Sequence, residues 1–192
     1  MEATAFAANV VRNLTNGSSP GALDEAGKRA LVRGTRFIPL LLSVLGKHGV
    51  AGADASKVST LIEACAAALK NLMEVAENKE AGRRAGVVAT LLRCLGHRAG
   101  GAAPSVAVAA GRTPTSSNVQ WLMCAMWSIM LDKDAKGEVV AIPGAIAFLV
   151  ALLRANADAD AGVLLQMGGA LQSLAISDDG ENALAAAGAQ LA

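Results

Sequence analysis

The sequence offers few residues whose side chains could carry out chemistry, and the best pair is a cysteine and a histidine. Cys94 and His97 lie three residues apart near the end of an apolar segment, a spacing at which both side chains could bind one metal ion. No second pair of ligands follows at zinc-site spacing, and Cys65, Cys124 and His48 belong to other segments. We therefore interpret the pair as a buried cysteine beside an exposed histidine and expect no metal site.

Nothing in the sequence predicts an enzyme. A cysteine nucleophile would need a histidine base, and nothing else resembles such a catalytic set. The motifs of phosphate-binding loops, dinucleotide-binding folds and zinc proteases are absent. The paired glycines at 100–101 and 168–169 lack the strand-turn-helix setting that a phosphate-binding loop needs. We expect no catalysis, no cofactor and no small-molecule substrate.

The composition is that of a folded chain with almost no net charge. Of the 192 residues, 53% are hydrophobic and 17% are charged, so the chain can fill a core. The formal charge of +1 lacks the basic excess of nucleic-acid-binding domains. Aromatic residues make up only 3%, which is too few for a base-stacking platform. We expect no nucleic-acid partner.

Targeting and membrane signals are also weak. Residues 1–6 have neither the basic nor the apolar segment of a signal peptide. The longest uncharged apolar stretch, 139–153, contains Pro143 and is shorter than the roughly 20 residues that cross a bilayer. The 3 cysteines cannot all pair with one another, which favours reduced thiols. We expect a cytoplasmic protein without membrane insertion, with a nuclear or cytoskeleton-associated location as the alternative.

Apolar residues recur at the three- and four-residue spacing of helices, most clearly in 59–75 and 119–131. Shorter segments are apolar on nearly every side, so other helices must cover them all round. These segments are 37–45, 87–95 and 145–153. No segment alternates polar and apolar residues for long enough to suggest a sheet. The sequence predicts an all-α fold with loop insertions at about 46–57 and 96–118, where glycine and proline gather.

Two short patterns repeat along the chain. The first is a small residue followed by apolar, variable, polar and apolar residues, and the second is a glycine that opens an apolar block. The first pattern occupies 68–72, 125–129 and 170–174, with a weaker copy at 10–14. The second occupies 86–95 and 144–153, starts again at 188, and has an earlier version without the glycine at 36–45. Such regular repetition indicates a stack of similar helical units.

These patterns resemble the armadillo repeat. Residues 144–153 resemble its second helix, which typically reads Gly-Ala-Ile-x-x-Leu-Val-x-Leu-Leu, and residues 68–72 and 170–175 resemble its third helix. Glu77-Asn78 resembles the Glu-Asn pair that precedes its short first helix. The best-matching repeat is 144–188, whose length fits the roughly 40–47 residues of armadillo units.

The resemblance implies a right-handed superhelical solenoid of about three to four repeats. Residues 1–192 would form a single armadillo-like domain with partial repeats at both ends. A three-helix unit cannot bury its inner helix alone and must stack on its neighbours, which also favours a solenoid. A piece of a longer solenoid is the alternative.

The resemblance also implies a binding site. Third helices of armadillo proteins line a concave groove, where asparagine side chains hydrogen-bond the backbone of an extended peptide. The matching positions here are Asn71, Ser128 and Ser173. Receptors similar to importin alpha add a tryptophan four residues before each asparagine, and none of the three positions here has one. Recognition of basic nuclear-localisation signals is therefore not expected.

Two tryptophans extend the candidate site. Trp121 and Trp127 occur in the same segment as a helical stripe of Met123, Met126 and Met130. We assign most of this stripe to the core. Methionine adapts to irregular surfaces and tryptophan is a common interface anchor, so we expect one tryptophan to face outward and contribute to protein binding.

One basic cluster is open to two interpretations. Arg83, Arg84, Arg93, His97 and Arg98 could bind an acidic partner or a phosphate. We favour a solvated face that nearby glutamates balance.

The leading hypothesis is a non-catalytic scaffold that binds a partner protein or extended peptide through the concave third-helix surface. The alternative is a purely structural segment of a longer armadillo protein or large assembly, without a groove ligand.

Overall fold

The computed structural model describes residues 2–18, 21–48, 55–97 and 116–188. Within these ranges the chain forms eleven α-helices and no strand, so the predicted all-α fold is confirmed. The helices are α1 (Glu2–Thr15), α2 (Glu25–Gly34), α3 (Phe37–His48), α4 (Ala55–Leu72), α5 (Ala76–Arg84), α6 (Val87–Leu95), α8 (Ser116–Met130), α9 (Lys133–Ala141), α10 (Ala145–Ala155), α11 (Ala161–Ala175) and α12 (Asp178–Ala186).

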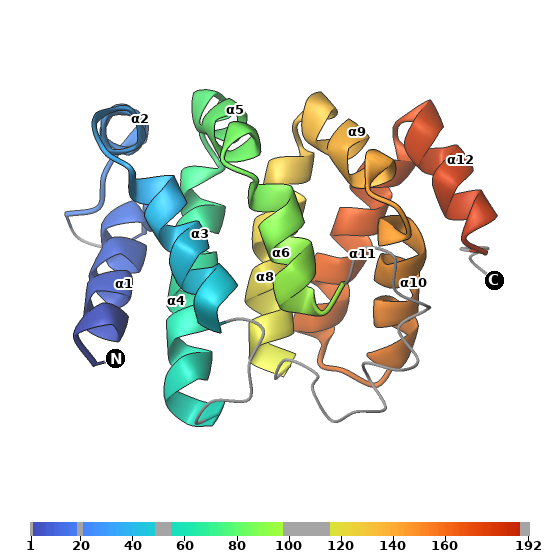
Figure 1. Ribbon diagram of the computed structural model, residues 1–192, viewed down its shortest axis with the longest axis horizontal. Coiled ribbons are helices and arrows are strands. Elements are labelled where there is room, and N and C mark those ends of the chain that lie inside the picture. The colour runs from blue at the N-terminus through green and yellow to red at the C-terminus, as the bar shows by residue number, and fades with distance from the viewer. Residues whose placement is uncertain (1, 19–20, 49–54, 98–115, 189–192) are drawn as a thin grey trace.

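The helices lie in rows (Figure 1). The long helices α1, α4, α8 and α11 contact one another in succession. The short helices α2, α5, α9 and α12 follow one edge, at the top of the view, where α2 contacts α5 and α9 contacts α12. Helices α3, α6 and α10 form a further row, in which α3 contacts α6. The short helices α2, α5 and α9 are thus each followed, among the described residues, by one helix of the middle row and one long helix.

The predicted loop insertions are partly wrong at their edges. Helix α3 continues to His48 and α4 begins at Ala55, so 46–48 and 55–57 are helical. Leu45 is fully buried, and its packing outweighs the low helix propensity of Gly46. Residues 116–118 are also helical, because serine and asparagine suit the start of a helix, here α8. Positions 49–54 and 98–115 lie outside the described residues.

Side chains and glycines define the helix ends. Asp24, Asp132 and Asp160 cap α2, α9 and α11, each accepting a hydrogen bond from a backbone N–H three residues later, at 2.8, 3.1 and 3.0 Å. Gly86 and Gly144 precede α6 and α10 with φ of 82° and 75°, in the left-handed region that glycine favours. The repeated glycine of the sequence pattern is thus a sharp turn between a short helix and the next helix.

A single hydrophobic core runs through the rows of helices. Leu45 of α3, Leu69 of α4, Leu91 of α6 and Met126 of α8 have no exposed surface. Fully burying one such side chain stabilises the fold by roughly 1.5–3 kcal/mol. The helices of the middle row are the apolar segments that the sequence predicts to be covered all round. For α3 this prediction is wrong, because Leu40 is 58% exposed on a face that no described helix covers.

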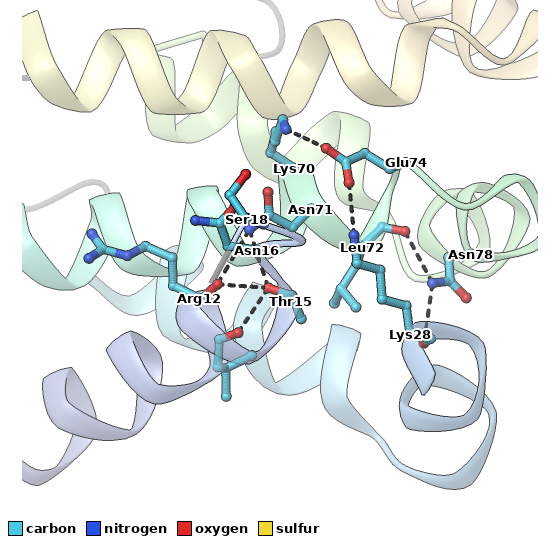
Figure 2. Close-up of polar contacts among 11 residues, drawn as sticks. Arg12, Thr15, Asn16, Ser18, Lys28, Lys70, Asn71, Leu72, Glu74 and Asn78 are labelled. Carbon is cyan, nitrogen blue, oxygen red and sulfur yellow. Dashed lines mark hydrogen bonds and ion pairs between the residues drawn. The ribbon is translucent and has the colours of Figure 1, made fainter. Parts of the chain in front are cut away.

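The side chain of Asn78 in α5 forms hydrogen bonds to α4 and to α2 (Figure 2). The expected Glu77-Asn78 pair lies in the first turn of α5 rather than before it, because α5 begins at Ala76. Asn78 is 2% exposed, and its Nδ2 donates to the carbonyl oxygens of Leu72 at 3.1 Å and Lys28 at 3.3 Å. It therefore satisfies carbonyls at the end of α4 and within α2.

Among the described helices, none is by itself both long and apolar enough to cross a membrane. Helices α9 and α10 meet that criterion only as a pair, with a bend of 92° between them.

Candidate protein-binding surface

The long helices present equivalent positions side by side. In each of α4, α8 and α11 we take four residues spaced by four, three and four, a spacing that keeps side chains on one helix face. We call these twelve residues the α4–α8–α11 surface. They are Glu63, Ala67, Lys70 and Glu74 from α4; Gln120, Cys124, Trp127 and Leu131 from α8; and Leu165, Gly169, Gln172 and Ile176 from α11. Glu74, Leu131 and Ile176 stand just beyond their helix ends.

Contacts between neighbouring helices show that the three sets adjoin. A Cβ built on Gly169 would lie 2.7 Å from the indole of Trp127, so that ring rests directly on the backbone of α11. At the start of α11, a Cβ on Gly162 would lie 2.6 Å from Nε2 of Gln120. Cys124 of α8 interacts electrostatically with Lys70 and Glu74 of α4.

The surface changes character from α4 to α11. The α4 side is charged and internally paired: the Glu74 carboxylate forms ion pairs with Lys70 and, at 2.8 Å, with the buried Lys28 of α2 (Figure 2). The α8 and α11 side is uncharged and exposes large apolar side chains beside Gln120 and Gln172, with Leu131 62%, Leu165 62% and Ile176 75% exposed. Large apolar side chains so exposed and grouped are typical of interaction surfaces.

Glu74 is the carboxylate most affected by this arrangement. Its partial burial raises the pKa, but hydrogen bonds from Lys28 and Lys70 and their positive charges lower it by more. The pKa of Glu74 therefore lies below its usual value, and the group keeps its negative charge to lower pH.

The predicted asparagine-type positions border this surface. Asn71 is 7% exposed, and its Nδ2 donates over 3.4 Å to the carbonyl oxygen of Arg12 and to Oγ1 of Thr15, both in α1 (Figure 2). Ser128 is half-buried, and its Oγ donates to the carbonyl of Cys124 at 2.9 Å. Ser173 is 5% exposed. Each lies one residue after Lys70, Trp127 or Gln172, respectively, toward the contact with the preceding long helix.

The two predicted tryptophans lie on opposite flanks of the exposed face of α8. Both are half-buried and pack against the core. Trp127 belongs to the α4–α8–α11 surface, whereas Trp121, six residues earlier, lies about 120° away around the axis of the same helix. The structure therefore brings Trp127 next to Ser128 and Leu131, and leaves Trp121 outside this set.

Sequence reasoning missed the exposed apolar residues. Leu131 and Ile176 occupy the register position that the charged Glu74 has in the α4 set. Leu165 occupies the position that the polar Gln120 has in the α8 set. The polar positions of the first pattern are Asn71, Ser128 and Ser173. Three residues later stand Glu74, Leu131 and Ile176, so a longer repeat alignment would have found Leu131 and Ile176.

Cys94 and His97, the candidate metal ligands, form hydrogen bonds to other parts of the chain. The Cys94 thiol donates to the Leu45 carbonyl at 3.5 Å, and Nε2 of His97 lies 3.1 Å from the carbonyl oxygen of Pro143. His97 is 8% exposed and packs edge-on against Phe148, so the expectation of an exposed histidine was wrong. Within the described part of the chain, no three residues of metal-binding type come together.

The buried thiols are poor nucleophiles. Burial raises the pKa of Cys65 to about 12 and that of Cys94 to about 11. Both would be protonated at neutral pH, and only the thiolate reacts readily. Cys124, which is half-buried on the α4–α8–α11 surface, also has a raised pKa because of burial, with Lys70 opposing the shift.

Two arginines of the basic cluster are paired with carboxylates. Arg83 of α5 forms ion pairs with three residues of the next short helix, Asp132 at 3.3 Å, Asp134 at 2.9 Å and Glu138 at 3.1 Å. Arg84 pairs with Glu80 within α5. Carboxylates at the start of α9 and within it thus balance the charge of Arg83, which links α5 to α9, whereas Glu80 balances that of Arg84.

No protein-family model matches this sequence, and no curated protein or solved structure matches the chain significantly.

Proposed function

We propose that this chain is an armadillo-like helical solenoid that binds a partner protein through the α4–α8–α11 surface and catalyses no reaction. The single observation that carries the proposal is the exposed apolar group of Leu131, Leu165 and Ile176 beside Trp127. Exposing such side chains to water is unfavourable, so a surface that keeps them in one place is suited to association.

The arrangement of the long helices supports the armadillo-like part of the proposal. Helices α1, α4, α8 and α11 follow one another in contact, as stacked repeats do. The glycines that open successive repeats, Gly86, Gly144 and Gly188, share a positive φ. The cytoplasmic location expected from the sequence stays a prediction.

A surface variant tests the function. Leu131→Glu and Leu165→Glu together place two charges on the α4–α8–α11 surface, and Leu40→Glu on α3, 58% exposed, is the matched control. Proteins that co-purify with each variant are compared quantitatively with those of the wild type. We expect the double variant to lose a partner that the control retains, while the melting temperatures stay close because all three positions are exposed.

The native thiol Cys124 provides a second readout. Because Cys65 and Cys94 are 1% and 2% exposed, alkylation of the folded protein reports mainly on Cys124. The recovered partner should slow alkylation of Cys124. If the double variant retains every partner and Cys124 is never protected, the proposal fails and the purely structural alternative gains support.

A further inference from the structure

The α8 and α11 half of the surface is free of charged side chains. Helices Ser116–Met130 and Ala161–Ala175 contain no aspartate, glutamate, lysine, arginine or histidine along their whole length. Two adjoining long helices with no charge are unusual in a chain of which 17% is charged. These two helices therefore supply no counter-charge to a charged ligand along their length, and carboxylates stand beside their ends at Asp132, Asp160, Asp178 and Asp179.

The contact of Trp127 with Gly169 lies in the same region. With no side chain on Gly169, the indole of Trp127 lies against the α11 backbone. The exposed Leu131, Leu165 and Ile176 surround this contact in the register of the two helices. Tryptophan in such a setting is a frequent energetic centre of protein interfaces.

The charged residues of the α4 half already have polar partners, including Glu63, which accepts a hydrogen bond from Oγ of Ser59 at 3.3 Å. Lys70 is paired with Glu74, and Glu74 is also paired with Lys28. A charged partner segment would have to compete with these ion pairs on α4 or lose its hydration without compensation on α8 and α11.

We propose that the α8 and α11 half of the surface binds an uncharged partner segment that inserts large apolar side chains around Trp127. This inference rests on the proposed function and adds to it the chemistry of the partner. The absence of charge selects against acidic and basic segments, and the exposed aliphatic side chains supply the favourable burial.

A peptide-display selection tests the chemistry of the partner. The full chain is the target, and the probe is a library of random 12-residue peptides. We expect the selected peptides to be rich in leucine, isoleucine, phenylalanine and tryptophan, with a net charge near zero. Their affinity should change little with added salt, because few charges are neutralised.

Variants locate the binding site of the selected peptides. Leu165→Glu should weaken binding by about tenfold or more, as truncating an interface centre does. Leu40→Glu, the matched exposed leucine on α3, should leave the affinity unchanged. Binding should also change the tryptophan fluorescence and slow alkylation of Cys124.

The outcomes distinguish this inference from the proposed function. Strongly acidic or basic peptides that protect Cys124 would overturn the apolar chemistry and leave the binding function intact. Peptides insensitive to Leu165→Glu would overturn both. A concentration-dependent dimer in light scattering that Leu165→Glu abolishes would show that a second copy occupies the surface, and would also overturn the inference.

Discussion

The indole of Trp127 in α8 rests on Gly169 in α11, so closely that a Cβ at Gly169 would come within 2.7 Å of the ring. This contact joins two long helices at the centre of the apolar half of the α4–α8–α11 surface. It also explains why a glycine occurs in the middle of α11, where it weakens the helix by about 1 kcal/mol relative to alanine. The packing of a neighbouring ring against the backbone compensates for that weakness.

Replacing Gly169 by alanine should therefore displace the ring. Replacing glycine by alanine inside a helix normally raises the free energy of unfolding by up to about 1 kcal/mol. Gly169→Ala should not show this increase, because the new Cβ and the indole of Trp127 cannot both keep their positions. Urea unfolding measures the stability, and the emission maximum of tryptophan measures the shift of Trp127.

The adjacent Gly168 is the matched control. A Cβ there meets nothing within 4 Å, so Gly168→Ala should raise the stability by about 0.5–1 kcal/mol and leave the emission unchanged. Equal stabilisation by the two substitutions would contradict the Trp127–Gly169 contact.

Much of the fold could be predicted from local patterns. The periodic leucines around Leu69 predicted α4, and the glycines that open the second repeated pattern, Gly86 and Gly144, prove to be left-handed residues at sharp turns. The predicted helix limits failed at Gly46, where the burial of Leu45 extends α3. A local pattern reports propensity, and packing at such a boundary overrides it.

Contacts between helices distant in sequence could not be predicted. Arg83 of α5 pairs with Asp134 and Glu138 of α9, and the ring of Trp127 in α8 lies against Gly169 of α11. His97 was expected to be exposed because it follows an apolar segment, yet the turn before α10 covers it through Pro143. Each depends on how one helix aligns against another, which the spacing within either helix does not specify.

The ion pairs of Glu74 should make stability depend on acidic pH. A carboxylate whose folded-state pKa is lowered stabilises the fold fully above its unfolded pKa of about 4.3, and this stability is lost as pH falls through the folded pKa. Glu74→Gln should cost about 1 kcal/mol or less at pH 7, because the carboxylate is partly exposed and solvent screens it. The difference from the wild type should shrink below about pH 4 in thermal unfolding.

A double-mutant cycle with Lys28 provides the control for Glu74. In the Lys28→Met background, Glu74→Gln should have a smaller effect at pH 7, because the buried ammonium of Lys28 is the partner it loses. Additive effects of the two substitutions at pH 7 would argue against this coupling.

Arg83 should stabilise the contact between α5 and α9. Its side chain is 20% exposed, and its guanidinium faces three carboxylates of the α9 region, so Arg83→Gln removes three ion pairs at once. We expect a lower melting temperature and a larger fall than in Arg84→Gln, whose side chain is 78% exposed and pairs only within its own helix. The difference between the variants should narrow in high salt, which screens such pairs. A difference that is independent of salt would indicate that packing rather than charge carries the effect.

Gln166 of α11 should be replaceable with a gain in stability. Its Oε1 atom is buried and has no hydrogen-bond partner among the described residues. A buried acceptor without a partner costs about 1–3 kcal/mol, so Gln166→Leu should raise the free energy of unfolding by about 1 kcal/mol, with part of the gain lost to imperfect packing. Gln172→Leu, on the exposed face of the same helix, makes the same chemical change without removing a buried polar atom. In urea unfolding it should shift stability by no more than about 0.5 kcal/mol. If Gln166→Leu is as neutral as Gln172→Leu or destabilises the protein, the buried oxygen of Gln166 has a partner in solution.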